Sequence, residues 1–385
     1  MDRMKRIFII QNTPLSEPLP LSIYLTDLLR NFKKNKSLEI NLIIGRSKEI
    51  PKEVITLCSS IYQFPSNTYS IKDNVKFSFF VKKVLKKENA KKKVDIVHCL
   101  YPNSSLLGAI LFKNLDNKQT RVIYDVRSPW IEMSIERGFI SPLFASIYKK
   151  FLYFEEKALC KQVDNFVFIT EGLRDYYFKK CKIESKPFLI SPSGVDTNLF
   201  RKMNTSIRKK YGIKHNQILI GSVGGIAKIR KLDVFLDIFK DVTKMDNHVK
   251  LMFVGSGDAL EDLKNKTRYF NLQDKVIFAG SVPHKDIPKY ISAFDFGLCH
   301  LPDRFIYENS FPLKILEYLS CGIPVLASDI KAHRGLKKNL KNIFIYGPKD
   351  DIKEILRKSS YKKNTSLRDY SWNSLTKLYE NLWIS

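Results

Sequence analysis

The sequence predicts an α/β protein with two doubly wound domains that face a central cleft. In both halves of the chain, apolar segments typical of strands alternate with amphipathic segments typical of helices. The 385 residues exceed an ordinary single domain and suffice for two, each large enough to bury a core. The hydrophobic content of 44% excludes wholesale disorder.

Composition limits the partners and the compartment. The formal net charge of +27 favours an anionic partner and leaves anionic lipid, nucleic acid and phosphorylated small molecules open. Six scattered cysteines without C-x-x-C spacing predict core thiols in a reducing compartment, so we expect neither a disulfide nor a metal site. No apolar run approaches the ~18 residues of a membrane span. The first residues lead directly into a strand, which favours a cytoplasmic protein.

The first half opens with a strand at 5–10, a proline-containing loop at 11–20, an amphipathic helix at 22–34 and a second strand. A basic helix follows at 76–94, in which lysines alternate with the apolar side chains Phe77, Phe79, Phe80, Val81, Val84 and Leu85. Such a helix can lie on anionic lipid. It can equally pack its apolar side into the core and leave its lysines in solvent, and the sequence leaves both interpretations open.

Polar side chains follow another predicted strand of the first half. The strand that begins at 121 runs into Asp125 and Arg127, and a Pro-Trp turn with Trp130 comes next. An open α/β sheet presents residues at this position to its crevice, so we expect these side chains near a ligand. The alternative is an aspartate that caps a helix and forms a salt bridge. The lone His98, on the preceding strand, is interpreted as structural.

The second half begins with a strand, a glycine loop and a helix at 217–242. Gly224 and Gly225 allow the backbone to approach a ligand closely. Lys228, Arg230 and Lys231 then place positive charge at the start of the helix, which suits an anion. No G-K-[ST] closes the loop, so it is not a Walker loop.

The stretch at 307–328 reads as a loop, a helix, a glycine stop and a buried strand. Ser310 can cap the helix, Pro312 fits its first turn and Gly322 suits a left-handed stop, which predicts a helix from about 311 to 320. Lys314 and Glu317 share one side of it. The cation stands beside the helix N-terminus and the acid lies one turn deeper, which suits a nucleotide diphosphate: phosphates at the helix end, ribose hydroxyls on the carboxylate.

This stretch resembles the donor-binding motif of the family 4 retaining glycosyltransferases, whose fold is GT-B. Eight positions of S-x-P-x-K-x-x-E-Y-x-x-x-G-x-P-V match: Ser310, Pro312, Lys314, Glu317, Tyr318, Gly322, Pro324 and Val325. The resemblance extends to D-x-R-x-x-W at Asp125, and to a glycine turn plus K-G-x-D with Arg230 at the lysine and Lys231 at the glycine. Asn309 stands where the family often has a second glutamate.

The resemblance implies the fold limits and the site. The turn at 193–196 is similar to one that ends the family's first domain, so we expect a Rossmann-like acceptor domain at 1–195, a donor domain at 196–365 and a helix at 366–385 that crosses back to the first domain. Implied catalytic residues are Asp125, Glu317 and Arg230. Implied donor-binding residues are Gly224, Gly225, Lys228, Arg230, Lys231, Pro312, Leu313, Lys314 and Glu317, and implied acceptor-side residues are Asn12, Arg127 and Trp130.

The implied reaction moves a sugar, with retention of configuration, from a nucleotide diphosphate sugar to a lipid-linked or polysaccharide acceptor. It implies no obligatory metal and no cofactor besides that co-substrate, with peripheral contact to an anionic membrane. Asn309 and the missing acceptor-loop glycines motivate an alternative, a GT-B-like regulatory subunit without activity or a sugar-nucleotide epimerase. A nucleic-acid-binding protein would explain the charge, but no recognised binding module appears in the sequence.

Overall fold

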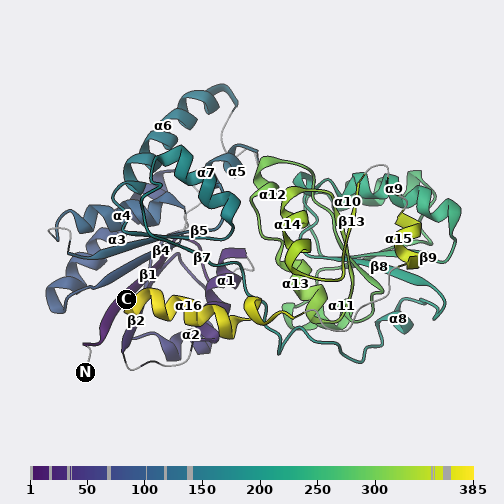
Figure 1. The fold of residues 1–385 in the computed structure, drawn as a ribbon, viewed down its shortest axis with the longest axis horizontal. Coiled ribbons are helices and arrows are strands. Elements are labelled where there is room, and N and C mark those ends of the chain that lie inside the picture. The colour runs from purple at the N-terminus through teal and green to yellow at the C-terminus, as the bar shows by residue number, and fades with distance from the viewer. Residues whose placement is uncertain are drawn as a thin grey trace. The chain divides into compact units, whose positions relative to one another are not determined.

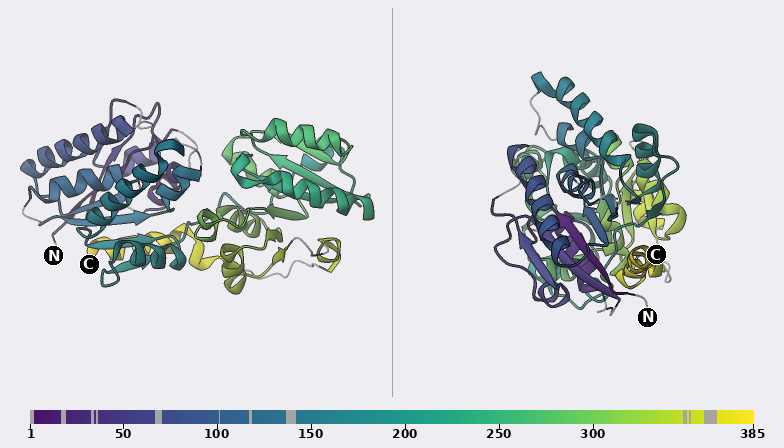
Figure 2. Two further views of the ribbon diagram at one scale, coloured as in Figure 1. Left: turned by 90° about the horizontal axis from the view of Figure 1, so that it is seen from above. Right: turned by 90° about the vertical axis from the view of Figure 1, so that its left-hand side faces the viewer.

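The computed structural model describes residues 3–16, 20–32, 35, 37–66, 71–100, 102–116, 119–136, 142–347, 350, 352–358 and 366–385. The chain divides into two compact units. Residues 1–194 and 372–385 form the first unit, and residues 195–371 form the second. In each unit helices cover both faces of a parallel sheet, as Figure 1 and Figure 2 show. The predicted α/β class and doubly wound topology are confirmed.

The first unit has a seven-stranded sheet in the order β3-β2-β1-β4-β5-β6-β7. Its strands are β1 (Lys5–Gln11), β2 (Leu38–Ile44), β3 (Ser60–Gln63), β4 (Ile96–Leu100), β5 (Arg121–Val126), β6 (Asn165–Phe168) and β7 (Phe188–Ile190). Its helices are α1 (Pro20–Arg30), α2 (Lys52–Leu57), α3 (Ile71–Lys91), α4 (Asn103–Lys113), α5 (Trp130–Glu136), α6 (Pro142–Cys160), α7 (Glu171–Cys181) and α16 (Trp372–Ile384).

Side-chain alternation in β1 builds the two faces of this sheet. Ile7 and Ile9 belong to the apolar cluster that α1, α2 and α16 complete, while Phe8 and Ile10 are buried outside that cluster. The last helix contributes Trp372, Leu375, Tyr379 and Trp383 to the same cluster. Residues from the end of the chain therefore complete the core of the first unit.

The second unit has a six-stranded parallel sheet in the order β10-β9-β8-β11-β12-β13. Its strands are β8 (Ile218–Val223), β9 (Val249–Val254), β10 (Val276–Gly280), β11 (Phe296–Cys299), β12 (Val325–Ser328) and β13 (Ile343–Tyr346). Its helices are α8 (Ile207–Lys210), α9 (Leu232–Met245), α10 (Leu260–Tyr269), α11 (Ile287–Ile291), α12 (Phe305–Glu308), α13 (Leu313–Ser320), α14 (Lys331–Asn339) and α15 (Ile352–Lys358). The strand order reverses between β8 and β11, and ligands bind at such a switch point in open α/β sheets.

The basic helix α3 packs into the first unit. Phe77, Val81 and Leu85 are fully buried and Val84 is 7% exposed, so these apolar side chains are not available to lipid. Of the apolar residues that the sequence offered for a membrane contact, Phe79 alone is mostly exposed, at 57%. The interpretation of α3 as a core-facing helix with lysines in solvent is therefore the one that the structure supports.

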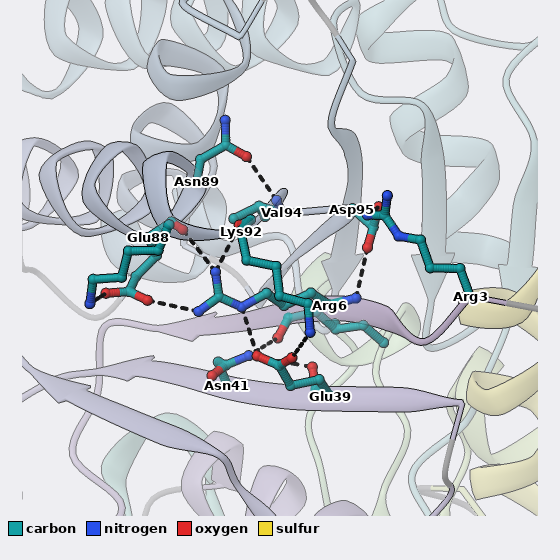
Figure 3. Close-up of polar contacts among 11 residues, drawn as sticks. Arg3, Arg6, Glu39, Asn41, Glu88, Asn89, Lys92, Val94 and Asp95 are labelled. Carbon is teal, nitrogen blue, oxygen red and sulfur yellow. Dashed lines mark hydrogen bonds and ion pairs between the residues drawn. The ribbon is translucent and has the colours of Figure 1, made fainter.

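A buried arginine ties the end of α3 to the sheet, as Figure 3 shows. Arg6 on β1 pairs through Nη2 with Glu88 Oε2 at 2.7 Å and through Nε with Glu39 Oε1 at 2.7 Å. Burial raises the pKa of Glu88, but hydrogen bonds from Lys91 and Arg6 outweigh it and hold that pKa at about 2. These ion pairs join β1, β2 and α3 at the end of the sheet where β1 begins.

No helix among the described residues is long and apolar enough to cross a membrane.

Candidate functional site

One tyrosine bridges β8 and β11 where the two strands part. The two strands pair only through Phe296 with Ile220 and Gly297 with Gly221, and they part beyond these residues. The hydroxyl of Tyr318 fills the gap: it accepts a hydrogen bond from the Val223 N–H at 3.0 Å and donates one to the Leu298 carbonyl at 3.2 Å. Tyr318 matched the motif in the sequence, but sequence reasoning gave it no role.

Close approach of two glycine turns shapes the loop after β8. Gly224 has φ +102° and its carbonyl oxygen lies 2.1 Å from where a Cβ on Gly255 would stand, so neither position suits a side chain. Gly224 and Gly225 are exposed, and a Cβ on either would meet no atom within 4 Å. The loop therefore presents bare, accessible backbone at the end of β8, as the sequence predicted for a close ligand.

Arg230 and Lys314 lie close enough for the charge of Arg230 to act on Lys314. Arg230 lies in the single turn of 3-10 helix at Lys228–Arg230, before α9, and Lys314 lies in the first turn of α13. Burial, with the nearby Arg230 guanidinium adding to it, lowers the pKa of Lys314 to about 8. An anion bound here would offset the effect of Arg230 on the Lys314 ammonium.

The start of α13 differs from the prediction. Ser310 does not cap the helix, because its hydroxyl donates to the Tyr307 carbonyl at 2.8 Å. The helix begins at Leu313 and Pro312 occupies the N-cap position without a side-chain cap. The N–H groups of its first turn thus have no side-chain acceptor from the cap residue. The predicted stop is confirmed: Gly322 has φ +72°, and its N–H donates to the Leu319 carbonyl at 3.0 Å.

The remaining predicted donor residues lie in three places. Leu313 and Glu317 lie on α13 with Lys314, and all three are partly exposed. Lys231 is exposed and adopts the left-handed conformation, with φ 52°, at the position where the family motif has glycine. Lys228 pairs instead with Asp262 at 3.0 Å on the surface. We therefore keep Lys228 apart from the cluster of Arg230 and Lys314.

Two buried histidines support the site and were missed at the sequence level. His333 receives a contact from Cys299 Sγ to its Nε2 at 3.4 Å, and its Nδ1 lies 2.7 Å from the Ser328 carbonyl. Nδ1 of His300, the residue after β11, lies 2.7 Å from the Tyr346 hydroxyl. Burial lowers the pKa of His300 to about 4, so it is neutral at physiological pH. No local motif marks these residues, because Cys299 and Tyr346, their side-chain partners, are distant in sequence.

Asn309, at the position of the family's second glutamate, is 5% exposed. Its Nδ2 donates to the Phe305 carbonyl at 3.0 Å and so closes the short helix α12. This side chain has a structural partner at the position where the motif often carries an acid.

In the first unit, Asp125 and Arg127 form a buried ion pair. Asp125 is 0% exposed, and its Oδ1 lies 2.6 Å from Arg127 Nε. Arg127 also donates to the Ser191 carbonyl at 2.9 Å and to the hydroxyls of Tyr24 and Tyr379. The prediction that Asp125 contacts a sugar or acceptor does not fit this burial, and neither does a pocket-lining role for Arg127. Of the alternative that the sequence left open, the salt bridge is confirmed, but Asp125 lies inside β5 and not at the N-cap of a helix.

His98 completes this network. Its Nδ1 accepts a hydrogen bond from the Trp383 indole N–H at 3.0 Å, and its Nε2 lies 3.3 Å from Asp125 Oδ2. An indole nitrogen only donates, so Nδ1 carries no proton and Nε2 carries it toward the carboxylate. His98 is therefore a structural residue, as the sequence analysis interpreted it.

Asn12 and Trp130, from the predicted acceptor side, meet at the first residues of α4. Trp130 Nε1 donates to Asn103 Oδ1 at 2.9 Å, and Asn12 Nδ2 donates to Ser104 Oγ at 3.3 Å. Asn12 follows β1 and α4 follows β4, and the strand order of the first sheet reverses between these two strands. Both residues thus lie where an open sheet offers a crevice. Asn12 is 4% exposed, which leaves little of it accessible.

Within the described residues, no three His, Cys, Asp or Glu side chains gather so that they could hold a metal ion.

Comparisons with known proteins divide the chain as its two units do. A sequence model of the "Glycosyltransferase Family 4" family matches residues 21–199, and one of the "Glycosyl transferases group 1" family matches residues 203–369. Together they span most of the chain.

Among curated relatives, an alpha-monoglucosyldiacylglycerol synthase from Streptococcus pneumoniae is 25% identical over 242 residues, 61% of this chain and 52% of the relative. A UDP-Gal:alpha-D-GlcNAc-diphosphoundecaprenol alpha-1,3-galactosyltransferase from Escherichia coli is 25% identical over 337 residues, 79% of this chain and 75% of the relative. The match thus spans only about half the length of the first relative.

Among solved structures, sucrose-phosphate synthase from Thermosynechococcus elongatus has a TM-score of 0.73 at 16% identity, covering 99% of each chain. Anabaena HepE in complex with UDP and glucose has a TM-score of 0.71 at 13% identity, covering 100% of each chain. These similarities establish the GT-B fold.

Proposed function

The chain belongs to the family 4, group 1 glycosyl transferases, and from this premise we propose that it transfers a sugar from a nucleotide diphosphate sugar in cell-surface glycan synthesis. One observation carries the proposal. Arg230, in the turn that follows the exposed Gly224–Gly225 loop, lies close enough to Lys314, in the first turn of α13, for its charge to lower the pKa of that lysine.

Electrostatics suit this arrangement to the leaving group. Glycosyl transfer builds negative charge on the departing diphosphate, and fixed cations and helix N–H groups stabilise charge that develops in a transition state. At an effective dielectric near 20, a cation about 4 Å from a phosphate charge contributes about 4 kcal/mol before desolvation. Arg230 and Lys314 supply two such charges, and Lys231 stands next to Arg230. In this proposal they hold the diphosphate without a metal ion.

The other roles follow from position on α13. Glu317 lies on the side of Lys314 and one turn deeper, so it is proposed to bind the ribose hydroxyls. Pro312 and Leu313 form the entrance of the helix beside the phosphates. Retention of configuration rests on the resemblance to family 4. Asp125 takes no part in the proposed chemistry, because its carboxylate is buried against Arg127.

The proposed acceptor is a lipid-linked or polysaccharide glycan at the cytoplasmic face of a membrane. Two relatives support this class, since their names describe a diacylglycerol glycolipid synthase and a galactosyltransferase that acts on a diphosphoundecaprenol-linked sugar. Asn12 and Trp130, at the switch point of the first sheet, are the proposed acceptor-side residues.

Calorimetric titration of the purified chain with UDP, GDP, ADP and CMP, with and without EDTA, tests the proposal. We expect one nucleoside diphosphate to bind selectively and equally well in EDTA. Incubation of the corresponding nucleotide sugars, followed by detection of released nucleoside diphosphate, then tests activity. Binding without transfer or hydrolysis would favour an inactive relative, and the absence of binding by all four would refute the donor site.

A further inference from the structure

The outer face of α6 carries an apolar stripe that is largely exposed. Ile147, Phe151 and Phe154 are 75%, 60% and 74% exposed. Their spacing places them on one face of the helix. Large apolar side chains usually face the core, so a row of three in solvent calls for a partner. The first turns of α6 also reach beyond the other helices of the unit (Figure 1 and Figure 2).

Buried contacts on the opposite face fix this orientation. Glu156 is 0% exposed, and its Oε2 lies 2.5 Å from Lys180 Nζ on α7, while its Oε1 accepts a hydrogen bond from Tyr177 at 2.9 Å. Leu152 and Leu159 are buried beside it. A rotation of α6 that covered the phenylalanines would bring Glu156 out and leave Lys180 without this partner. The stripe is therefore held outward by the packing.

Positive charge borders the stripe. Lys150 is exposed, and Lys149 and Lys157 are partly exposed on the same helix, with Lys161 just beyond its end. Glu155 is the one acidic residue in the described part of α6 that is partly exposed, and burial together with the neighbouring Glu156 raises its pKa. Long lysine side chains can hold their charges at a polar boundary while their stems and the neighbouring rings enter an apolar layer. Apolar residues bordered by cations match the boundary of an anionic bilayer.

We propose that α6 docks the protein on an anionic lipid bilayer through Ile147, Phe151 and Phe154, with the neighbouring lysines on the lipid headgroups. A second copy of the chain fits this face less well. Two identical faces packed together would bring their lysines close, and one helical stripe supplies little of the area that a stable dimer buries. The proposal gives the expected membrane contact a location on α6, in place of the apolar side of α3.

Vesicle sedimentation of the full chain tests the proposal apart from transferase activity. The probes are vesicles of pure phosphatidylcholine and vesicles with about one third phosphatidylglycerol. We expect binding to the anionic vesicles, weakened by salt. The variant Phe151→Ser/Phe154→Ser should bind at least tenfold more weakly. It should keep its unfolding midpoint and its nucleoside diphosphate affinity, because both side chains are exposed.

Two matched variants of α3 distinguish its contribution to vesicle binding from that of α6. Phe79→Ser removes the exposed ring of α3, and Lys83→Gln/Lys86→Gln/Lys87→Gln removes exposed charges of α3. We expect the first to bind as the parent does and the second to lose less than Lys149→Gln/Lys150→Gln/Lys157→Gln. Unchanged binding of the α6 phenylalanine variant would overturn the proposal. So would equal binding of the parent to both vesicles, or light scattering that shows a dimer which the α6 variant dissolves.

Discussion

The indole N–H of Trp383 donates a hydrogen bond to Nδ1 of His98, 285 residues earlier in the chain, at 3.0 Å. Both side chains are at most 1% exposed. This bond joins α16 to β4 inside the core of the first unit, and it sets which ring nitrogen of His98 faces Asp125. A residue near the end of the sequence therefore orders the polar network of the first unit.

We predict that Trp383→Phe destabilises the protein more than Trp372→Phe. Both replacements remove similar volume from the same cluster. Trp383→Phe also leaves a buried acceptor without its donor, which costs about 1–3 kcal/mol. The indole nitrogen of Trp372 has no hydrogen-bond partner among the described residues, so that variant loses no such bond. Denaturant unfolding followed by circular dichroism measures the difference, and equal losses would contradict the role of the bond.

We predict that Asp125→Asn acts on stability. A buried guanidinium left without its carboxylate costs about 3–5 kcal/mol. The double variant Asp125→Asn/Arg127→Met should recover part of this loss, because contacting residues are coupled. Denaturant unfolding of both single variants and the double variant measures this coupling. A stable Asp125→Asn protein that binds the nucleotide sugar but transfers nothing would restore the catalytic role that the sequence indicated.

The sequence could predict what depends on local residue chemistry. Strand and helix alternation gave both doubly wound sheets, and Gly322 adopts the left-handed stop that its position required. The Ser310 cap was wrong because a nearer acceptor, the Tyr307 carbonyl, takes its hydroxyl. Whether Asp125 faces a ligand or a buried partner depends on Tyr24 and Tyr379, which are remote in sequence. The bridge made by Tyr318 likewise depends on where two strands part.

The sequence also could not predict which apolar helix face is exposed to solvent. Lysines alternate with apolar residues in both α3 and α6, so the pattern alone does not say which helix keeps its apolar side in solvent. Burial of Phe77 and Val81 in α3, and exposure of Phe151 and Phe154 in α6, are decided by which face each helix packs on its neighbours.

We predict that Arg230→Ala and Lys314→Ala each weaken nucleoside diphosphate binding about tenfold or more, since a hydrogen bond to a charged group contributes about 1.5–3 kcal/mol. Lys228→Ala is the matched control, because its ammonium is exposed and paired with Asp262. It should change affinity less than threefold. Isothermal calorimetry at fixed salt measures all three. Parent affinity in both Arg230→Ala and Lys314→Ala would show that the phosphates bind elsewhere.

We predict that nucleoside diphosphate affinity falls as the pH rises above about 8. Burial and Arg230 lower the pKa of Lys314 to about 8, so the free site loses its ammonium above that pH, whereas an unperturbed lysine would keep it to about 10.4. The bound anion favours the ammonium, so binding above pH 8 takes up a proton. Titrations between pH 7.5 and about 9.5 avoid phosphate ionisation near 6. Lys314→Arg should flatten the profile, and a parent profile that is already flat would contradict the assignment.

The lowered pKa of Lys314 also makes the stability of the folded chain depend on pH. The unfolded chain holds the Lys314 proton more tightly than the folded chain does, so protonated Lys314 costs stability below about pH 8 and the cost fades as the pH rises above it. Lys314→Met should therefore raise the midpoint of thermal unfolding at pH 7 while it weakens binding. The gain should shrink at pH 9.5, and a destabilised Lys314→Met protein would count against burial as the cause.

We predict that Lys231→Gly and Lys231→Ala separate charge from backbone strain. Lys231 adopts φ 52° and ψ 40° directly before α9, a conformation that costs an L-residue about 1–2 kcal/mol and glycine nothing comparable. Lys231→Gly relieves this strain but adds freedom to the unfolded chain, so we expect the glycine variant to be more stable than the alanine variant by about 0.5–1 kcal/mol.

Both variants lose the cation, so both should bind nucleoside diphosphate equally weakly if Lys231 holds a phosphate. Denaturant unfolding and calorimetry of the pair measure the two effects separately. An alanine variant at least as stable as the glycine variant would contradict the left-handed backbone. Parent affinity in both variants would remove Lys231 from the donor site and leave Arg230 and Lys314 to hold the diphosphate.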